Sequence, residues 1–243
     1  MNASVPRTAM VLAAGLGKRM RPITDTVPKP LVPISGRTLL DRGLDGLAEV
    51  GVETAVVNVH YLPDQIIDHV AARAAPRIII SDERDGLLDS AGGIVKALPL
   101  LGGDPFFILN ADTFWIDRGR PNLERLALEW DGARMDILLM LSDLASATGH
   151  SGGTDFLLGP GGALRRAAGA PDGLIYAGAA IVHPRIFAGA DAQPHSLNRY
   201  FDAAIAAGRL YGMPLAGSWI TVGTPDAIPA AEAAVARAAR DAG

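Results

Sequence analysis

Residues 8–22 read Thr8-Ala-Met-Val-Leu-Ala-Ala-Gly-Leu-Gly-Lys-Arg-Met-Arg-Pro22, an apolar run that passes directly into glycines and basic residues. A short apolar run that ends at a glycine is typical of a buried parallel strand. The small residues that follow would let backbone N–H groups approach a ligand closely, as in an anion-binding nest: Ala13, Ala14, Gly15 and Gly17. Positive charge comes next, at Lys18, Arg19, Arg21 and Lys29. Because convergent Lys and Arg suit a polyphosphate, this stretch predicts a strand that leads into a phosphate-binding turn.

The spacing of this turn excludes two common nucleotide-binding loops. Gly15-Leu-Gly17 has no third glycine at the dinucleotide spacing, and no Gly-Lys-Ser/Thr sequence follows. A lone Gly-x-Gly would indicate only a strand-to-helix turn beside solvated charges. Here it occurs together with Arg19 and with Pro28-Lys-Pro-Leu-Val-Pro33, and that combination favours nucleotide binding.

Outward from this turn, strand and helix patterns alternate up to residue 110. Strands are predicted over 8–14, 54–60, 77–81 and 105–110. Helices are predicted over 39–50, 63–75 and 92–98, and Gly51 follows the first of them as a C-cap. This rhythm predicts an α/β fold, a Rossmann-like, mostly parallel sheet with helices on both faces.

The second half of the chain is less regular. Strands are predicted over 135–141 and 174–182, helices over 198–207 and 225–242, and loops with short hairpins over 142–174. No internal repeat or low-complexity linker interrupts the pattern. We therefore expect a single domain over residues 1–243.

Composition excludes several classes of protein. The 243 residues are 49% hydrophobic and 20% charged, the balance of an ordinary soluble globular domain. With no cysteine, disulfides, thiolate catalysis and Cys-ligated metals are excluded, which fits a cytoplasmic protein. A net charge of −4 argues against a broad nucleic-acid-binding surface. No apolar run reaches the roughly 18–20 residues that span a membrane.

A carboxylate follows the fourth predicted strand, in Asn110-Ala-Asp112. Ligands of open parallel sheets bind beyond the carboxyl ends of the strands, so Asp112 is placed where a ligand would lie. Its hard oxygen atoms suit Mg²⁺, which proteins hold with one or two carboxylates together with phosphates and water. The alternative is an aspartate that caps the next turn.

Taken together, 12–24 and 28–33 resemble the signature of the sugar-1-phosphate nucleotidyltransferases, which implies the nucleotide-diphospho-sugar transferase type of fold. The resemblance implies that the backbone of Ala13 to Gly15 contacts the base and the α-phosphate. It assigns Arg19 to the triphosphate and the leaving pyrophosphate, Lys29 to the phosphates near the reacting centre, and Asp112 to Mg²⁺. It divides the chain into a nucleotide-binding half, about 1–115, and a sugar-binding half, about 116–243.

Further elements of the family match in part. Asp89-Ser-Ala-Gly-Gly-Ile94 resembles the element near the nucleobase and ribose, which adds Asp89, Ser90 and Gly92 to the nucleotide site, with Asn110 beside them. The alternative for Ser90 is an N-cap at the start of a helix. Asp155 resembles a sugar-contacting aspartate, and Tyr176-Ala-Gly178 resembles a stretch that lines the sugar pocket. There Gly178 would let the sugar approach the backbone.

The chain departs from the family pattern near its C-terminus. The family usually carries Trp-x-Asp-x-Gly-Thr, whose Asp is a second metal ligand, whereas this chain has Thr221 in Trp219-Ile-Thr-Val-Gly-Thr224. A hydroxyl is a weaker Mg²⁺ ligand than a carboxylate, so we assign Thr221 to the sugar site and leave the metal to Asp112, the phosphates or a further carboxylate. The family's Glu-Lys-Pro element is also absent. We interpret His60 and His150 as structural or solvated, because neither has metal-type spacing.

The length and the run from Leu88 to Gly102 resemble one subgroup, the bacterial uridylyltransferases that act on N-acetylmuramate 1-phosphate in peptidoglycan recycling. This resemblance implies UTP and N-acetylmuramic acid 1-phosphate as substrates and Mg²⁺ as cofactor. We expect a monomer or a homodimer. Mannose-1-phosphate guanylyltransferases resemble it too, and the residues alone do not separate the two substrate pairs. Thr221 leaves open a non-catalytic nucleotide-sugar-binding regulatory protein, and an unrelated α/β binding domain is a further alternative.

Overall fold

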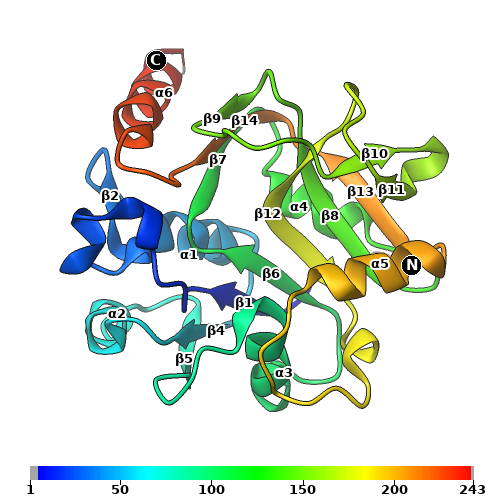
Figure 1. Cartoon of the computed structure of the whole chain (residues 1–243), viewed down its shortest axis with the longest axis horizontal. Helices are drawn as coiled ribbons and strands as arrows, with labels where there is room; N and C mark the ends of the chain where they lie inside the picture. Colours follow the sequence, from blue (N-terminus) through cyan, green and yellow to red (C-terminus); the bar gives the residue numbers. More distant parts are fainter. Residues whose placement is uncertain (1–4, 242–243) are drawn as a thin grey trace.

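The computed structural model describes residues 5–241, and a seven-stranded sheet lies at its centre (Figure 1). The strands stand in the order β13-β8-β12-β6-β1-β4-β5. Their bounds are β1 Thr8–Leu12, β4 Thr54–Val59, β5 Arg77–Asp82, β6 Phe106–Asn110, β8 Ile137–Ser142, β12 Ile175–Val182 and β13 Leu210–Pro214. All run in one direction except β12, which is antiparallel to both β6 and β8. The predicted mostly parallel sheet is confirmed.

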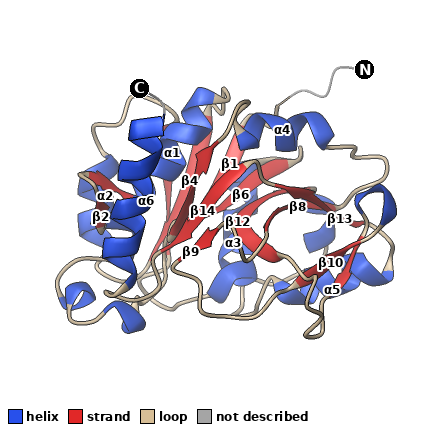
Figure 2. Ribbon diagram, turned by 90° about the horizontal axis from the view of Figure 1, so that it is seen from above, coloured by secondary structure: helices blue, strands red, loops and turns tan. Residues whose placement is uncertain are grey.

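Helices cover both faces of this sheet (Figure 2). One face carries α1 (Leu39–Glu49), α2 (Pro63–Val70) and α4 (Asn122–Glu129), and the other carries α3 (Asp89–Leu101) and α5 (Asn198–Ala206). Successive strand residues point to opposite faces, so Ala9 and Val11 join the core under α1 while Met10 joins the core under α3. These two cores fix the strand ends from which the candidate site is built.

A smaller sheet, β7-β14-β9, stands beside the central one. Its strands are β7 Thr113–Asp117, β9 Ala147–Thr148 and β14 Gly217–Thr221, and Thr221 lies opposite Thr113. The terminal helix α6 (Ala227–Asp241) packs on this sheet through Ala227, Ala231 and Ala234. Short two-stranded pairs complete the fold, β2 (Pro33–Ile34) with β3 (Arg37–Thr38) and β10 (Phe156–Leu158) with β11 (Leu164–Arg166).

Several predicted boundaries were wrong. The helix expected over 63–75 is shorter and ends at Val70. The helix expected over 92–98 spans Asp89–Leu101. Elements that went unpredicted include β2, β3, β7, α4, β13 and β14. Within residues 5–241, none of the helices combines the length and the apolar character that crossing a membrane requires.

Candidate active site

The predicted site residues gather where β1, β4 and β6 end, and the antiparallel β12 begins at the same edge. Three cavities lie along this edge. The basic cavity, of about 230 Å³, is lined by Gly15, Gly17, Lys18, Arg19, Met20, Lys29, Asp112 and Gly223. The central cavity, of about 240 Å³, is lined by Leu12, Ala14, Gly15, Asn58, Leu87, Asp89, Ser90, Asn110 and Asp112. The aromatic cavity, of about 230 Å³, is lined by Leu12, Ser90, Asn110, Asp155, Phe156, Tyr176, Ser196, Leu197, Asn198 and Phe201.

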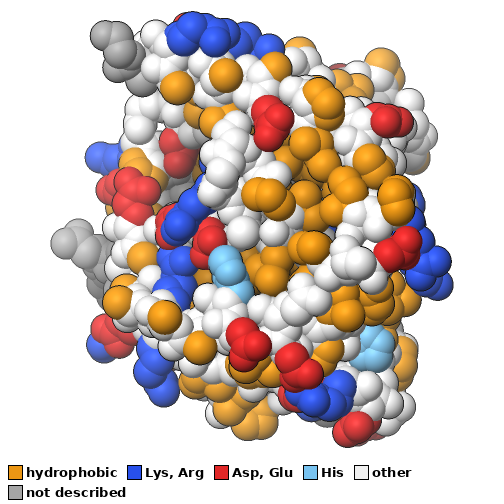
Figure 3. Space-filling view, turned by 90° about the vertical axis from the view of Figure 1, so that its left-hand side faces the viewer, with side chains coloured by type: hydrophobic (Ala, Val, Ile, Leu, Met, Phe, Trp, Pro, Cys, Tyr) orange, Lys and Arg blue, Asp and Glu red, His pale blue; other side chains and the backbone are white. Residues whose placement is uncertain are grey.

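The three cavities adjoin one another along this edge, and together they are called the groove. Gly15 and Asp112 line both the basic and the central cavity. Leu12, Ser90 and Asn110 line both the central and the aromatic cavity. On the side of the molecule where α6 lies in Figure 1, Lys, Arg, Asp and Glu side chains surround a more hydrophobic centre (Figure 3). The groove can therefore hold an elongated ligand with an anionic end.

The glycine turn after β1 has the open backbone that anion binding requires. Gly17 has a left-handed φ of +60°, and a Cβ there would lie 3.0 Å from Thr24 Cγ2. The Thr24 hydroxyl donates to the Gly17 carbonyl over 2.8 Å, which fixes the turn. Gly15 has open space where a Cβ would stand, so a ligand can approach its backbone.

One backbone N–H group of this turn makes a hydrogen bond inside the protein, and two others make none within the described chain. The N–H of Ala13 donates to Asn58 Oδ1 over 2.7 Å, so it is not free for the nucleotide. Within the described chain, the N–H groups of Ala14 and Gly15 have no acceptor, and both residues line the central cavity. These two N–H groups are the ones a phosphate or a base can bind.

The basic residues near the turn differ in their partners. Lys18 and Arg19 are exposed and have no acidic partner among residues 5–241, while the Arg19 guanidinium lies beside Gly223. Arg21 pairs with Asp25 at 3.1 Å and lies outside the basic cavity. Lys29 is 9% exposed, and its Nζ lies 2.6 Å from Asp112 Oδ2. Lys18 and Arg19, which are unpaired within the described chain, thus face a cavity in which a third cation, Lys29, is held in place.

Asp112 is the carboxylate between the basic and central cavities, and its side chain is 41% exposed. Across residues 5–241 no three His, Cys, Asp or Glu side chains are grouped to hold a metal ion. A single reachable carboxylate fits Mg²⁺ only where phosphates and water supply the other ligands. Thr221, which replaces the family's second carboxylate, ends β14, and the next residue, Val222, donates its N–H to the Asp112 carbonyl over 3.3 Å. Asp89 is the other carboxylate of the central cavity.

The start of α3 is covered by the 193–197 segment. The Ser90 hydroxyl accepts from the Leu197 N–H over 2.9 Å, and the His195 carbonyl accepts from the Ala91 N–H over 3.0 Å. A Cβ on Gly92 would lie 2.2 Å from the Gln193 carbonyl oxygen, which explains the glycine by packing. The N-cap interpretation of Ser90 is wrong, because α3 begins at Asp89 and has Leu88 as its N-cap.

The aromatic cavity brings together two of the predicted sugar residues. The Asp155 carboxylate accepts from the Tyr176 N–H over 2.9 Å. The Tyr176 ring meets Phe201 edge-on at 5.6 Å, and its hydroxyl is buried with no hydrogen-bond partner in the described chain. Burial and the nearby charge of Asp112 raise the pKa of the Tyr176 phenol. This hydroxyl therefore stays protonated, and its capacity to donate a hydrogen bond is unused within the described chain.

Gly178 is explained by packing inside the protein. It is buried at an irregularity of β12 with φ of +81°, and a Cβ would lie 2.5 Å from Thr113 Oγ1.

The two histidines, His60 and His150, fit their structural interpretation. His60 Nδ1 lies 2.7 Å from the Glu83 carbonyl, while His150 packs against Trp219 with ring centroids 5.5 Å apart.

Sequence reasoning missed Asn58, Glu83 and Phe201. Asn58 and Glu83 are buried side by side next to the glycine turn, and Phe201 forms a wall of the aromatic cavity. A polar residue near the end of the apolar strand Thr54-Ala-Val-Val-Asn-Val59 was a signal for Asn58. Phe201 gave no signal, because an aromatic residue on a helix is usually part of a core.

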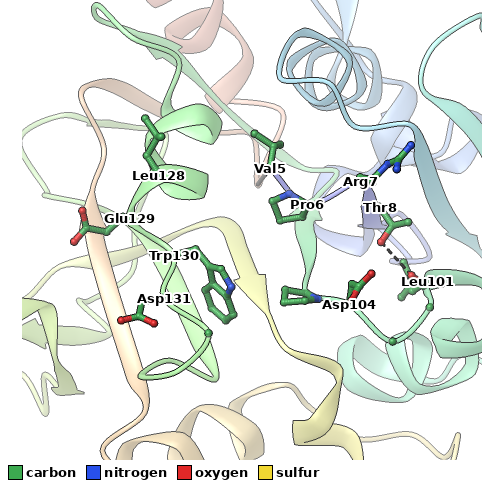
Figure 4. Close-up of a pocket in the computed structure, with 14 residues that line it drawn as sticks. Val5, Pro6, Arg7, Thr8, Leu101, Asp104, Leu128, Glu129, Trp130 and Asp131 are labelled. Carbon is green, nitrogen blue, oxygen red and sulfur yellow. Dashed lines mark hydrogen bonds between the residues drawn. The ribbon is translucent and has the colours of Figure 1, made fainter. Parts of the chain in front are cut away.

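A larger cavity, of about 820 Å³, lies at the opposite edge of the sheet (Figure 4). It is lined by the segments that precede β1 and β6 and by the end of α4, with Trp130 and Asp104 on its walls. None of the predicted site residues lines it. In open α/β sheets ligands bind at the carboxyl edge, so we place the active site in the groove.

Comparison with known proteins shows the family to which the chain belongs. Residues 9–157 match the model of the family described as the MobA-like NTP transferase domain. The chain is 44% identical over 241 residues to the N-acetylmuramate alpha-1-phosphate uridylyltransferase of Caulobacter vibrioides, covering 97% of this chain and 100% of that protein. It is 34% identical over 220 residues to the Neisseria meningitidis protein of the same name, covering 89% and 93%.

A solved structure supports the fold alone. The inositol-1-phosphate CTP transferase from T. maritima superposes with a TM-score of 0.77 at 19% identity, covering 91% of each chain. The resemblance to sugar-1-phosphate nucleotidyltransferases that the sequence indicated is confirmed by these comparisons. The roles of individual residues stay predictions.

Proposed function

This chain belongs to the MobA-like NTP transferase family, and on that premise we propose that it joins the nucleotidyl group of a nucleoside triphosphate to a sugar 1-phosphate and releases pyrophosphate. One observation carries the proposal: the groove has cations without an acidic partner in the described chain at one end, and the polar residues Asp155, Ser196 and Asn198 beside Tyr176 at the other. A triphosphate needs the first end, and a sugar needs directed hydrogen-bonding groups such as those at the second.

The reaction needs positioning and charge neutralisation more than proton transfer. A phosphate oxygen of the sugar 1-phosphate attacks the α-phosphorus, and the bond from that phosphorus to the bridging oxygen breaks as pyrophosphate leaves. The attacking phosphate is already largely ionised near neutral pH, with a second pKa of about 6, so no general base is assigned. Mg²⁺ held by Asp112 and the phosphates would supply further positive charge.

Named residues can divide this work along the groove. Arg19 and Lys18 would neutralise the charge that develops on the leaving pyrophosphate. Lys29, held by Asp112, would lie beside the reacting phosphorus. The N–H groups of Ala14 and Gly15 would bind the nucleotide in the central cavity. Tyr176 and Asp155 would orient the sugar, because both line the aromatic cavity that Asn110 joins to the central one.

For the substrates we propose UTP and N-acetylmuramic acid 1-phosphate. Support comes from the two uridylyltransferases described above, which this chain matches over most of its length. N-acetylmuramic acid is a peptidoglycan sugar, so the activity would serve the recycling of cell-wall material. An enzyme that consumes UTP needs the compartment that supplies it, and we propose a cytoplasmic location on that ground.

The test is pyrophosphate release with Mg²⁺ across four nucleoside triphosphates and the 1-phosphates of N-acetylmuramic acid, mannose and glucose. Reactions without sugar phosphate control for simple hydrolysis of the triphosphate, and mass spectrometry identifies the nucleotide sugar. We expect the highest kcat/KM for UTP with N-acetylmuramic acid 1-phosphate. No turnover with any pair, by a folded protein that still binds UTP, would contradict the proposal and favour a non-catalytic nucleotide-binding protein.

A further inference from the structure

A buried polar pair lies beside the central cavity, and the catalytic scheme above does not use it. Asn58 is the penultimate residue of β4 and is 2% exposed, and Glu83 follows β5 and is 1% exposed. The Asn58 amide Nδ2 donates to Glu83 Oε1 over 2.7 Å. Among residues 5–241, Glu83 has no Lys, Arg or His side chain as an ion-pair partner. We call these two residues the Asn58–Glu83 pair.

Burying a carboxylate is unfavourable, so its presence here needs a reason. A buried charge is tolerated only when hydrogen bonds satisfy its oxygens, and an apolar residue would avoid the cost. The helix above makes room for it, because a Cβ on Gly93 of α3 would lie 2.6 Å from Glu83 Oε1 and 2.8 Å from Asn58 Nδ2. Glycine inside a helix is itself unfavourable. Two unfavourable features therefore coincide at one point of the molecule.

The pair connects two walls of the central cavity. On one side, Asn58 Oδ1 accepts from the Ala13 N–H over 2.7 Å, at the start of the glycine turn. On the other side, Glu83 Oε2 accepts from the Leu88 N–H over 3.2 Å, at the N-cap of α3. Leu87, Asp89 and Ser90 next to that N-cap line the cavity opposite Ala14 and Gly15.

We propose that the Asn58–Glu83 pair is the positioning device of the nucleotide site, and that it sets the distance between the glycine turn and the start of α3. The inference rests on the proposed function. Asn58 Oδ1, Asn58 Nδ2 and both Glu83 oxygens each make a hydrogen bond inside the protein, and both side chains are almost fully buried, so we assign the pair to positioning. The pair acts on nucleotide affinity through the backbone that it holds.

The direction of each hydrogen bond gives a sharp test. In Asn58→Asp, a second carboxylate faces Glu83 and the donor is lost. In Glu83→Gln, one amide NH₂ must face either the Asn58 NH₂ or the Leu88 N–H, and donors then oppose each other. In the double variant Asn58→Asp/Glu83→Gln, the new amide donates to the new carboxylate, whose other oxygen still accepts from the Ala13 N–H. The oxygen of the new amide still accepts from the Leu88 N–H, so every bond is restored at an unchanged total charge.

The measurements are the UTP dissociation constant by calorimetry, the KM for each substrate, kcat and the thermal unfolding midpoint. We expect each single variant to weaken UTP binding by about tenfold or more, since a buried group loses its partner, and the double variant to recover to within about threefold of wild type. The KM for the sugar phosphate should change by less than about threefold in all three variants, because the pair does not line the aromatic cavity.

Gly93→Ala tests the pair without changing its chemistry, should the single variants fail to fold. Its Cβ would push into both side chains, and UTP binding should weaken, whereas Gly46→Ala on α1 has ordinary contact at 3.6 Å and should not weaken it. Folded single variants that bind UTP like wild type, or a double variant no better than the weaker single, would overturn the inference. A change in sugar-phosphate KM as large as that for UTP would also overturn it. If the wild type binds no nucleoside triphosphate, the proposed function fails first, and this inference with it.

Discussion

The basic side chains of the groove differ in what they can do because their partners differ. Arg19 has no acidic partner within the described chain and faces the basic cavity, so its charge is available to a ligand. Lys29 is almost buried and already paired with Asp112, so its position is fixed before any substrate binds. Arg21, a neighbour of Arg19 in sequence, is paired with Asp25 outside the cavity. Sequence proximity to the turn therefore does not by itself give a role.

Arg19→Ala should reduce kcat/KM by about 10²–10³, the scale observed when one charge-stabilising donor is removed from an active site. Steady-state pyrophosphate release measures it. Arg21→Ala is the matched control, because it removes an equal charge two residues away without touching the cavity. Equal losses in the two variants would contradict the assignment of Arg19.

Asp112→Asn should abolish turnover that depends on Mg²⁺ while the fold persists, since the neutral side chain loses the charge that holds the metal. Thr221→Asp should restore a second carboxylate near Asp112 and lower the Mg²⁺ concentration needed for half-maximal rate. Mg²⁺ titrations of both variants, with circular dichroism as the folding check, test the pair of expectations. A Thr221→Asp titration that matches wild type would mean that the site is completed by another residue.

Single elements carry the geometry of the groove, and β12 shows how. This strand runs against its neighbours, and its irregularity lies between Tyr176 and Ala180. The irregularity contains Gly178, whose missing Cβ leaves room for Thr113 of β7. The central and small sheets therefore approach each other closely at this point, next to the Asn110 side chain.

Gly178→Ala should destabilise the fold by about 2–4 kcal/mol, because it combines an unfavourable backbone conformation with a steric clash. The control is Gly169→Ala, where φ is +84° but no atom lies within 4 Å of the new Cβ. That variant carries only the backbone cost, about 1 kcal/mol. Chemical denaturation compares the two, and equal losses would mean that the contact with Thr113 relaxes freely.

Asp136 joins three strands at the edge away from the groove. Its Oδ1 accepts from Arg185 Nε over 2.6 Å and from Arg209 Nε over 2.9 Å, next to the ends of β8, β12 and β13. Burial alone would raise the pKa of Asp136, but hydrogen bonds and charges from Arg209 and Arg185 outweigh it and lower the pKa below the ordinary value. The ionised form is therefore the one that stabilises the fold.

The sign of the pH dependence follows. For a lowered pKa, the contribution to stability is complete above the unfolded-state value of about 3.9 and is lost as pH falls through the lower folded-state pKa. Asp136→Asn should cost about 1–3 kcal/mol near neutral pH. The difference between variant and wild type should shrink below about pH 4. Unfolding free energies at several pH values measure it, and a difference independent of pH would contradict the ionic role.

At the scale of the whole molecule, the two edges of the sheet carry two different hollows. The groove lies at the carboxyl edge, where strand ends and helix starts present backbone N–H groups. The larger cavity of Figure 4 lies at the amino edge, beside the ends of α3 and α4, and its acidic side chains include Asp104 and Glu129. A choice of candidate site by cavity volume alone would therefore have selected the cavity at the amino edge.

Glu129→Gln in the larger cavity should leave kcat/KM for both substrates within about twofold of wild type, the range expected for a surface substitution far from the chemistry. The pyrophosphate assay measures it beside Arg19→Ala, whose residue lies at the other edge. A loss comparable to that of Arg19→Ala would mean that the amino edge takes part in the reaction.

Much of the candidate site could be predicted because its signals are local. The glycine turn, Arg19, Lys29 and Asp112 lie next to strands whose apolar patterns are unmistakable, and parallel strands bring their carboxyl ends to one edge. The contacts that Ser90 and Gly92 make in the structure could not be predicted in this way. Their partners are the Leu197 N–H and the Gln193 carbonyl, about a hundred residues away in the chain, and no local pattern encodes such contacts.

The sequence by itself determined the α/β class, the order of most strands and helices, and the charged turn at the carboxyl edge, because periodicity and glycine placement act over a few residues. Only the tertiary structure decided that β12 runs antiparallel, that Asn58 and Glu83 meet beside the turn, and that the Tyr176 hydroxyl is left without a partner in the described chain. Those features arise where segments distant in the chain pack together. Burial there removes water, so each polar group depends on whichever neighbour the fold supplies.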